Sequence, residues 1–271
     1  WRKFDAKNWQ AEVSHEGTGA KYSVRVLPWL TTYRHLAYGA HPDELLPGER
    51  VNLFFNPSDK VQRAYLVHYQ DEICQMKGHN HAWQIEKVVD NGSGFTARVM
   101  AGDKPLDDKL AVFVIDPKCK VWRGGKRVDA AKPTPGERVY LTWVYDGNKR
   151  VVKLLSDAVS LDALQADSRK RTNARVKTDG MTAFVEDVTK DKARLLVFAT
   201  WWVQAGELKA GQTVRVQPGD GAAIEAKLTS RKNLGTYGSG CTELIVAGLD
   251  ARQQEVLRQW TGSKIVRVFA P

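Results

Sequence analysis

Pro47-Gly48-Glu49-Arg50-Val51 returns unchanged as Pro135-Gly136-Glu137-Arg138-Val139, and a looser copy stands at Ala210-Gly211-Gln212-Thr213-Val214. The Pro-Gly pair favours a tight turn, and the alternating apolar residues after each copy predict a β-strand. A segment that returns within the same order of surrounding elements indicates tandem modules. The fold prediction therefore starts from this turn and the strand behind it.

The surroundings of the first two copies repeat as well. Each turn is followed by a strand, a polar hairpin and a second strand, and three strand-like stretches precede it. The expected strands are 9–14, 21–27, 31–38, 51–55 and 63–70, then 83–89, 95–100, 110–115, 139–145 and 150–155. Closure into a small barrel buries the apolar face of five short strands and removes their edges. We therefore predict a mainly β chain of tandem five-stranded OB-like β-barrels.

Short helices are expected to connect the modules and to set the angle between them. The predicted organisation is a first barrel at 1–78, a second barrel at 79–158, a helical linker at 159–180 and a third module at 181–271. Ser160 is a suitable N-cap for a linker helix over 160–173, and a shorter helix over 71–78 stops at its glycine.

The third module departs from the pattern, because no clear third strand follows Trp201-Trp202. The elements expected after it are a glycine-rich loop at 233–240, a strand at 242–246, a helix at 251–260 capped by Asp250, and a last strand at 264–269. This order predicts a variant α+β module.

In strand order and in the Pro-Gly-Glu-Arg-Val turn before the fourth strand, residues 9–157 resemble the tandem OB-like modules of exported bacterial proteins of unknown function. The resemblance implies a fold far more than an activity. The sequence starts at Trp1 without a methionine, as a chain that has lost a signal peptide would. We therefore expect an extracytoplasmic protein, periplasmic or secreted.

The charge balance favours polyanionic partners. Lysine and arginine exceed aspartate and glutamate by 41 to 31, which gives a net charge of +10. Such a surplus suits nucleic acid, acidic glycans or anionic membrane surfaces. No apolar run reaches the length of about 18 residues that a transmembrane helix needs.

All six histidines fall within the first 81 residues. Cys74, Met76, His79 and His81 form a C-x-M-x₂-H-x-H segment, whose sulfur and imidazole donors suit copper, or zinc without the methionine. The other candidate ligands are His35 and His68, on the expected third and fifth strands of the first barrel. The alternative is that these are structural histidines at a barrel junction.

The three cysteines, Cys74, Cys119 and Cys241, are too few and too widely spaced for a disulfide scaffold. Buried idle thiols, a single disulfide and metal ligation all remain open. The sequence has no catalytic motif of the common hydrolases and no phosphate-binding loop. A Cys74 nucleophile with His79 or His81 lacks a third group to orient the base, so catalysis is not expected.

Two places combine aromatic and basic residues in a way that would suit a polyanion. The first holds Trp122, Arg123, Lys126 and Arg127, and the second holds Arg231, Lys232 and Tyr237 beside a glycine-rich loop. Stacking platforms in positive grooves bind single strands in OB folds, and loop amides cradle anions. The plainer alternatives are core aromatics and a hairpin whose glycines supply positive φ.

These patterns favour a non-enzymatic multi-barrel binding or scaffold protein that presents loops and inter-barrel grooves to a partner, either a protein or a polyanion, which the sequence does not identify. One alternative is binding of single-stranded nucleic acid or another polyanion by tandem OB folds. The other is copper or zinc binding through the histidine-rich first barrel.

Overall fold

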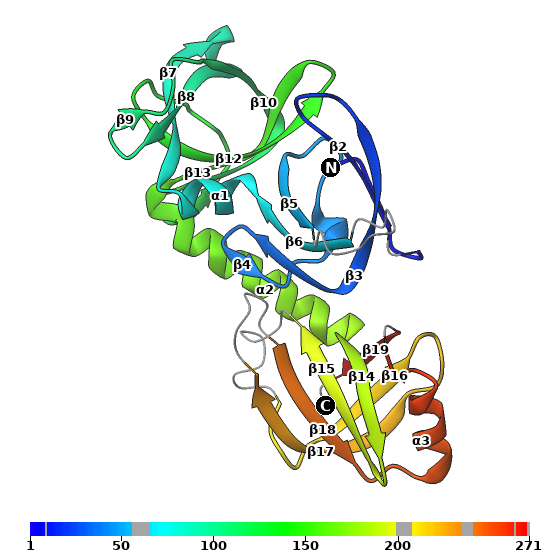
Figure 1. The fold of residues 1–271 in the computed structure, drawn as a ribbon. Helices are drawn as coiled ribbons and strands as arrows, with labels where there is room; N and C mark the ends of the chain where they lie inside the picture. Colours follow the sequence, from blue (N-terminus) through cyan, green and yellow to red (C-terminus); the bar gives the residue numbers. More distant parts are fainter. Residues whose placement is uncertain (9, 56–64, 199–207, 235–240, 263, 270–271) are drawn as a thin grey trace. The chain divides into compact units, whose positions relative to one another are not determined.

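The structure is a computed structural model, and it describes residues 1–271 except 9, 56–64, 199–207, 235–240, 263 and 270–271. Contacts group the chain into two compact units, one of residues 1–26 and 33–168 and one of residues 27–32 and 169–271. The first unit holds a β-sheet and a closed barrel, and the second holds another closed barrel (Figure 1). The prediction of a mainly β chain of small barrels with short helices is confirmed.

The first module is a six-stranded sheet in the order β1-β2-β3-β6-β5, with β4 added to β3. Its strands are β1 (Lys3–Asp5), β2 (Gln10–Ser14), β3 (Lys21–Arg34), β4 (Ala37–Tyr38), β5 (Val51–Phe55) and β6 (Tyr65–Asp71). The break expected between strands at 21–27 and 31–38 is wrong, because β3 runs without interruption to Arg34, and residues 37–38 form the separate strand β4. Pro28 does not end it, since the fixed φ of proline suits extended backbone.

The second module contains a closed ring of five strands, β7-β8-β10-β13-β12, in which β10 and β13 run parallel. Its strands are β7 (His81–Val89), β8 (Gly94–Ala101), β9 (Lys104–Pro105), β10 (Ala111–Arg123), β11 (Lys126–Val128), β12 (Arg138–Asp146) and β13 (Lys149–Asp157). Phe113 lies at the centre, with the rings of Trp83 and Trp143 meeting it edge-on at 5.0 and 5.9 Å. These two tryptophans are core residues.

The two modules share one strand order. In both, the same pair of backbone hydrogen bonds joins the start of the module to the repeated turn before its fourth strand. In the second module Gly136 donates to the carbonyl of Ile85 at 2.7 Å, and Ile85 donates to Glu137 at 2.8 Å. In the first module Trp1 takes the place of Ile85: Gly48 donates to its carbonyl at 2.8 Å, and the Trp1 nitrogen donates to Glu49 at 2.9 Å. The repeated turn therefore has the same partner position in both copies.

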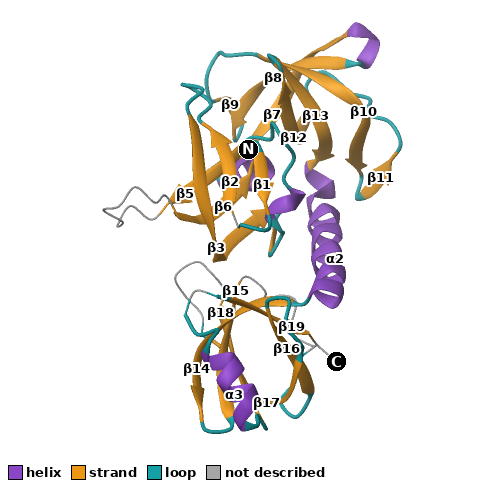
Figure 2. Cartoon of the chain, turned by 90° about the vertical axis from the view of Figure 1, so that its right-hand side faces the viewer, coloured by secondary structure: helices purple, strands orange, loops and turns teal. Residues whose placement is uncertain are grey.

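Helices follow the last strand of each of these modules (Figure 2). They are α1 (Glu72–Gly78), and η3 (Ala158–Ser160) leading into α2 (Leu161–Asp179), while η1 (Pro42–Glu44) and η2 (Asp90–Gly92) are single turns elsewhere. The predicted N-cap Ser160 is wrong. Asp157 caps η3 instead, by accepting the Ser160 N–H at 2.8 Å, and α2 runs beyond the expected end at residue 173.

The third module is a closed six-stranded barrel in the order β14-β15-β18-β17-β16-β19. Its elements are β14 (Met181–Thr189), β15 (Lys192–Phe198), β16 (Thr213–Pro218), β17 (Ile224–Asn233), β18 (Cys241–Ala247), α3 (Ala251–Arg258) and β19 (Ile265–Phe269). Asp250 caps α3 as predicted. Trp201-Trp202 lie outside the described residues.

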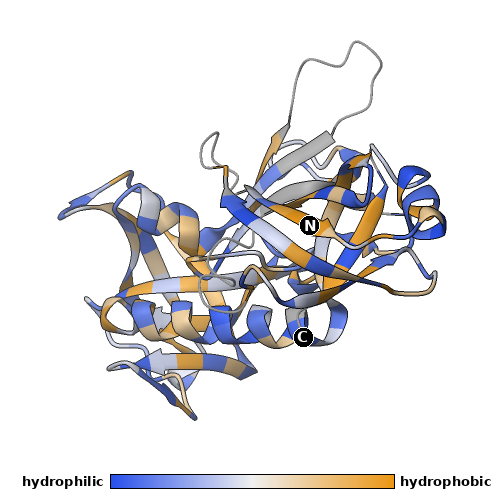
Figure 3. Ribbon diagram, turned by 90° about the horizontal axis from the view of Figure 1, so that it is seen from below, coloured by the Kyte–Doolittle hydropathy of each residue, from blue (hydrophilic) through white to orange (hydrophobic). Residues whose placement is uncertain are grey.

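Strands in both units alternate hydrophobic and hydrophilic residues, as Figure 3 shows. In β16 the pattern places Val214 and Val216 in the core and Thr213 and Arg215 at the surface. This period of two is typical of a barrel with one buried face. No helix within the described ranges is long and apolar enough to cross a membrane.

Candidate functional site

The repeated turn is built in the same way in all three copies. The backbone N–H of the Glu or Gln donates to a carbonyl three residues earlier, and its side chain accepts the N–H of that earlier residue. The pairs are Glu49 with Leu46, Glu137 with Thr134, and Gln212 with Lys209. The glycine between them has a φ of +81°, +83° or +95°. Such a φ favours glycine, which explains why Gly persists in every copy.

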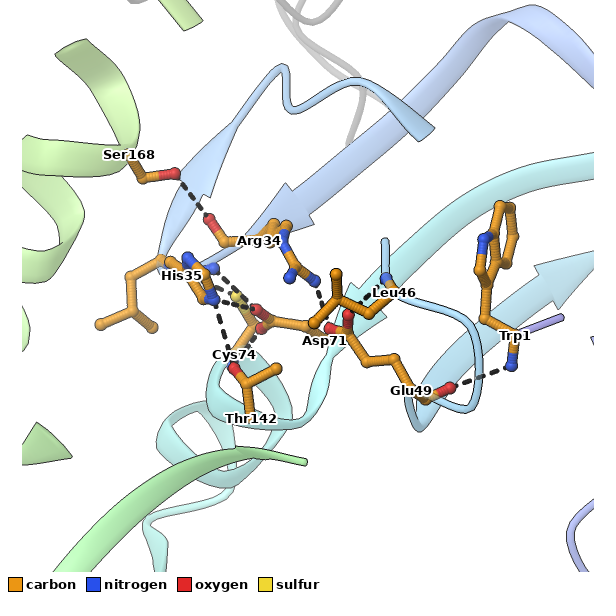
Figure 4. A network of polar contacts seen from close by, with 10 residues as sticks. Trp1, Arg34, His35, Leu46, Glu49, Asp71, Cys74, Thr142 and Ser168 are labelled. Atoms are coloured by element: carbon orange, nitrogen blue, oxygen red, sulfur yellow. Dashed lines mark hydrogen bonds and ion pairs between the residues drawn. The ribbon is translucent and has the colours of Figure 1, made fainter. Parts of the chain in front are cut away.

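A buried ion pair stands behind the first turn. Arg34 donates to Glu49, and both side chains are almost fully buried (Figure 4). Burial alone would lower the pKa of Arg34, but the carboxylates of Glu49 and Asp71 outweigh it and raise that pKa, so the guanidinium stays charged. Burial raises the pKa of Glu49, and Arg34 opposes this rise. With Arg34 fixed as a cation, the ionised form of Glu49 completes the pair.

Asp71 joins the end of β6 to the hairpin between β3 and β4. Its Oδ1 accepts the N–H of Cys74 at 2.9 Å, and its Oδ2 accepts the N–H of His35 at 2.9 Å. The N–H of Leu36 donates to Sγ of Cys74 at 3.1 Å. One carboxylate and one thiol thus hold both residues at the tip of this hairpin.

The second module repeats this arrangement bond for bond. Asp157 accepts the N–H of Ser160 at 2.8 Å and the N–H of Gly124 at 2.9 Å, while Gly125 donates to Oγ of Ser160 at 2.9 Å. Arg123, next to the hairpin, pairs with Glu137 as Arg34 pairs with Glu49. The network is therefore part of the module itself, and its presence alone indicates no ligand.

The two copies differ at the hairpin tip. The second has Gly124-Gly125 at φ +56° and +77°, whereas the first holds His35 and Leu36 at +48° and +63°. Non-glycine residues in this region cost about 1–2 kcal/mol each. Strain of this kind persists where surrounding contacts compensate for it.

The compensating contacts of the first tip come from the second barrel and α2. Nε2 of His35 lies 3.2 Å from Oγ1 of Thr142 on β12, and Gln165 of α2 donates to the carbonyl of Leu36. Oγ of Ser168 donates to the carbonyl of Arg34 at 3.3 Å. Leu36 also lies in the same apolar cluster as the second barrel's core. The first hairpin therefore locks the two modules together.

The structure distributes the six candidate metal ligands over separate places. Cys74 and His35 lie in the buried network, Met76 packs into the apolar core, and His68 contacts the ring of Phe54. Only His79 and His81 are neighbours near the surface, with ring centroids 5.7 Å apart. No group of three histidine, cysteine or acidic side chains suited to a metal occurs within the described residues. Copper or zinc binding stays a prediction for the His79–His81 pair.

The two described thiols, Cys74 and Cys119, show no sign of nucleophilic activation. Burial raises the pKa of Cys74 well above its ordinary value, and neighbouring Asp71 adds to the rise. Burial also raises the pKa of Cys119, to about 12. A reactive cysteine needs a depressed pKa together with access to solvent, and both of these thiols have a raised pKa instead. Cys74 and Cys119 are free thiols, and the side chain of Cys241 is outside the described part.

A groove of about 620 Å³ opens between the first repeated turn and the second barrel. It is lined by Leu46 and Pro47 of the turn, by 114–117 of β10, by 144–146 of β12, and by Lys149, Val151 and Lys153 of β13. Leu46, Val114 and Tyr145 are large apolar residues that remain 37% exposed there. Lys153 is paired with Asp116. The groove therefore has an apolar floor with charges of both signs.

The structure assembles only part of the expected polyanion site. Trp122, Arg123, Lys126 and Arg127 share the β10–β11 hairpin, where Trp122 faces Arg127 and Arg123 faces Lys126. Lys126 and Arg127 are exposed, Arg123 is engaged by Glu137, and Trp122 packs against the core. Arg231 and Lys232 lie on β17 in the other unit, and Tyr237 lies outside the described residues.

Sequence reasoning missed the duplicated network and the groove. The signal for the network was present, since Asp71-x-x-Cys74 and Asp157-x-x-Ser160 follow the last strand of each module. The groove has no such signal, because its lining comes from four separate segments. In the comparisons with known proteins, no family model, curated protein or solved structure matches this chain.

Proposed function

We propose that the chain is a non-enzymatic binding module, working outside the cytoplasm, that takes a protein partner in the groove beside the first repeated turn. The observation that carries this is the exposed apolar lining, in which Leu46, Val114 and Tyr145 surround one hollow. Exposed apolar residues that gather around a concavity mark interaction sites, whereas singly scattered ones do not.

The strand order of the second barrel also supports the groove as the binding site. Counting its ring strands along the chain gives the order 1-2-3-5-4, which we interpret as an OB fold. OB folds bind extended ligands on the face of their second and third strands and on the loop between the fourth and fifth. Here the third strand is β10 and that loop is the turn 146–149, and both line the groove. Aliphatic residues dominate over aromatic ones, which favours a peptide chain over nucleobases.

Selection of peptides from a random display library on the immobilised chain tests this proposal. Selected peptides are expected to lose at least tenfold in affinity for Val114→Asp, which puts a carboxylate into the apolar lining. Leu106→Asp is the matched control, because Leu106 is exposed but lies outside the groove. Peptides that bind both variants equally, or no enrichment at all, would contradict the proposal.

A second candidate function is polyanion binding by the β10–β11 hairpin, supported by the exposed Lys126 and Arg127 beside Trp122. Each phosphate contact to a single strand contributes about 0.7 to the slope of log K against log salt. Lys126→Ala with Arg127→Ala is expected to lower that slope for labelled oligothymidine by about 1.4. The control pair Lys104→Ala with Lys109→Ala is expected to leave it unchanged, and a shift in the control alone counts against this site.

A further inference from the structure

The interface between the first two modules has two sides, which we call the tail face and the head face. The tail face of the first module consists of His35, Leu36, Glu72 and Ile73, and each is less than a tenth exposed. It meets the head face of the second module, Thr142 on β12 with its cross-strand neighbour Leu154 on β13. Both head residues are buried, at 3% and 5% exposure. Helix α1, which carries Ile73, packs against β12 and β7.

The second module has a tail face of its own, and the residues that form it are exposed. The shared Asp71 and Asp157 networks make Gly124, Gly125, Ala158 and Val159 the equivalents of the four tail residues. All four are exposed, and Val159 is the most exposed large apolar residue within the described residues, at 76%. Its equivalent Ile73 is fully buried.

The head face of the first module is partly exposed, because Phe54 is exposed and His68 is half-buried. The strand register makes Phe54 the equivalent of Thr142 and His68 the equivalent of Leu154, since the two form a cross-strand pair at the same position. The Phe54 ring is 48% exposed and contacts the ring of His68, with centroids 5.2 Å apart. One copy of the chain therefore exposes the tail face of its second module and part of the head face of its first module. The corresponding faces at the junction between these modules cover each other.

We propose that a second copy of this chain docks head to tail on the first, its Phe54 and His68 covering Val159 and the Gly124-Gly125 turn. The contact continues the established interface between the first two modules. A tail meeting a head is a heterologous contact, so repetition gives an open chain of copies rather than a closed dimer.

The third barrel differs from the first two modules in the features that form a head face. Its strand order differs, and its repeated turn pairs with Leu228, which follows the turn in sequence, whereas Trp1 and Ile85 precede theirs. It therefore does not present the pair of strands that forms a head face. The glycine tip also lacks the histidine and leucine contacts of the first junction, so we expect a weak, reversible association.

Sedimentation velocity of the full chain over a range of concentrations tests the proposal. The wild type is expected to associate at about 0.1–1 mM, and Phe54→Asp and Val159→Asp are each expected to stay monomeric. An equimolar mixture of the two variants is expected to form a 1:1 complex that grows no further, because one supplies only a tail and the other only a head. Both positions are exposed, and unchanged circular dichroism and Tm establish that the variants fold.

The matched control is Val112→Asp, an exposed valine on β10 outside both faces, which should associate like the wild type. Monomeric wild type throughout that range overturns the proposal. Association that survives both substitutions, or variants that fail to complement each other, also overturns it. Peptide binding in the groove is measured separately with Val114→Asp, so failure of assembly and failure of the binding function are distinguishable.

Discussion

At the scale of single residues, the two hairpin tips differ in backbone strain and in their contacts with neighbouring elements. Gly124-Gly125 adopts positive φ without cost, whereas His35 and Leu36 adopt it under strain. His35 contacts Thr142 and Leu36 contacts Gln165, and these contacts compensate for the strain at the first tip. The sequence did not predict this, because a histidine in a β-rich segment indicates neither the hairpin nor the strain.

The glycine of the repeated turn allows a matched comparison between modules. A Cβ on Gly48 would lie 2.5 Å from the carbonyl oxygen of Tyr145, whereas one on Gly136 would meet nothing within 4 Å. Both have positive φ, so Gly136→Ala is expected to cost about 1 kcal/mol of unfolding free energy and Gly48→Ala about 3 kcal/mol. Urea unfolding followed by tryptophan fluorescence measures both. Equal losses would show that the first turn is not seated on β12.

Asp157 gives a prediction that depends on pH. Partial burial would raise its pKa, but hydrogen bonds from Ser160 and Gly124 outweigh this and hold it below the ordinary value. A lowered carboxyl pKa stabilises the fold above about pH 4, and this stability is lost as the pH falls through the folded pKa. Asp157→Ala is expected to lower the unfolding free energy at pH 7 by about 1 kcal/mol, and with it the urea midpoint, and to differ less from wild type at pH 3. A difference that is constant with pH would contradict this.

The thiols give a third prediction. Cys74 is buried and Cys119 is partly buried, which raises the pKa of both thiols, so a Cys241→Ser variant should react slowly with a thiol reagent at pH 8. Full reaction is expected only after addition of denaturant. Rapid labelling of either thiol in the native chain would contradict the claim that neither is activated as a nucleophile.

At the scale of elements, the sequence predicted strands where turns and alternation repeat. The turn before β5 and β12 and the alternating strand after it are local features, and they fold as expected. The boundaries of β3 and α2 were missed, because Pro28 was compatible with extended backbone and Asp157, not Ser160, supplies the cap. The copper or zinc segment was read from spacing alone, and folding turned Cys74 and Met76 inward while His79 and His81 stayed near the surface.

At the scale of the whole molecule, one arrangement of strands and polar contacts occurs twice within the first 168 residues. One strand order, one turn, one Arg-Glu pair and one Asp-centred network occur twice, and the first module packs on the second through His35 and Leu36. The groove opens beside the junction of the two modules. This arrangement could not be predicted from the sequence, because the docking contacts join residues that lie far apart along the chain.

Native-state hydrogen exchange of the full chain, comparing wild type with Thr142→Val, tests this docking most directly. The substitution removes the hydroxyl that meets His35 and keeps the side-chain shape, while Thr96→Val, on the outer face of β8, serves as control. If the two modules are one cooperative unit, the most protected amides of β6 and β13 should lose the same exchange free energy, about 1 kcal/mol. A loss confined to β12 and β13, with β6 unchanged, would show that the first module folds independently and would contradict the account.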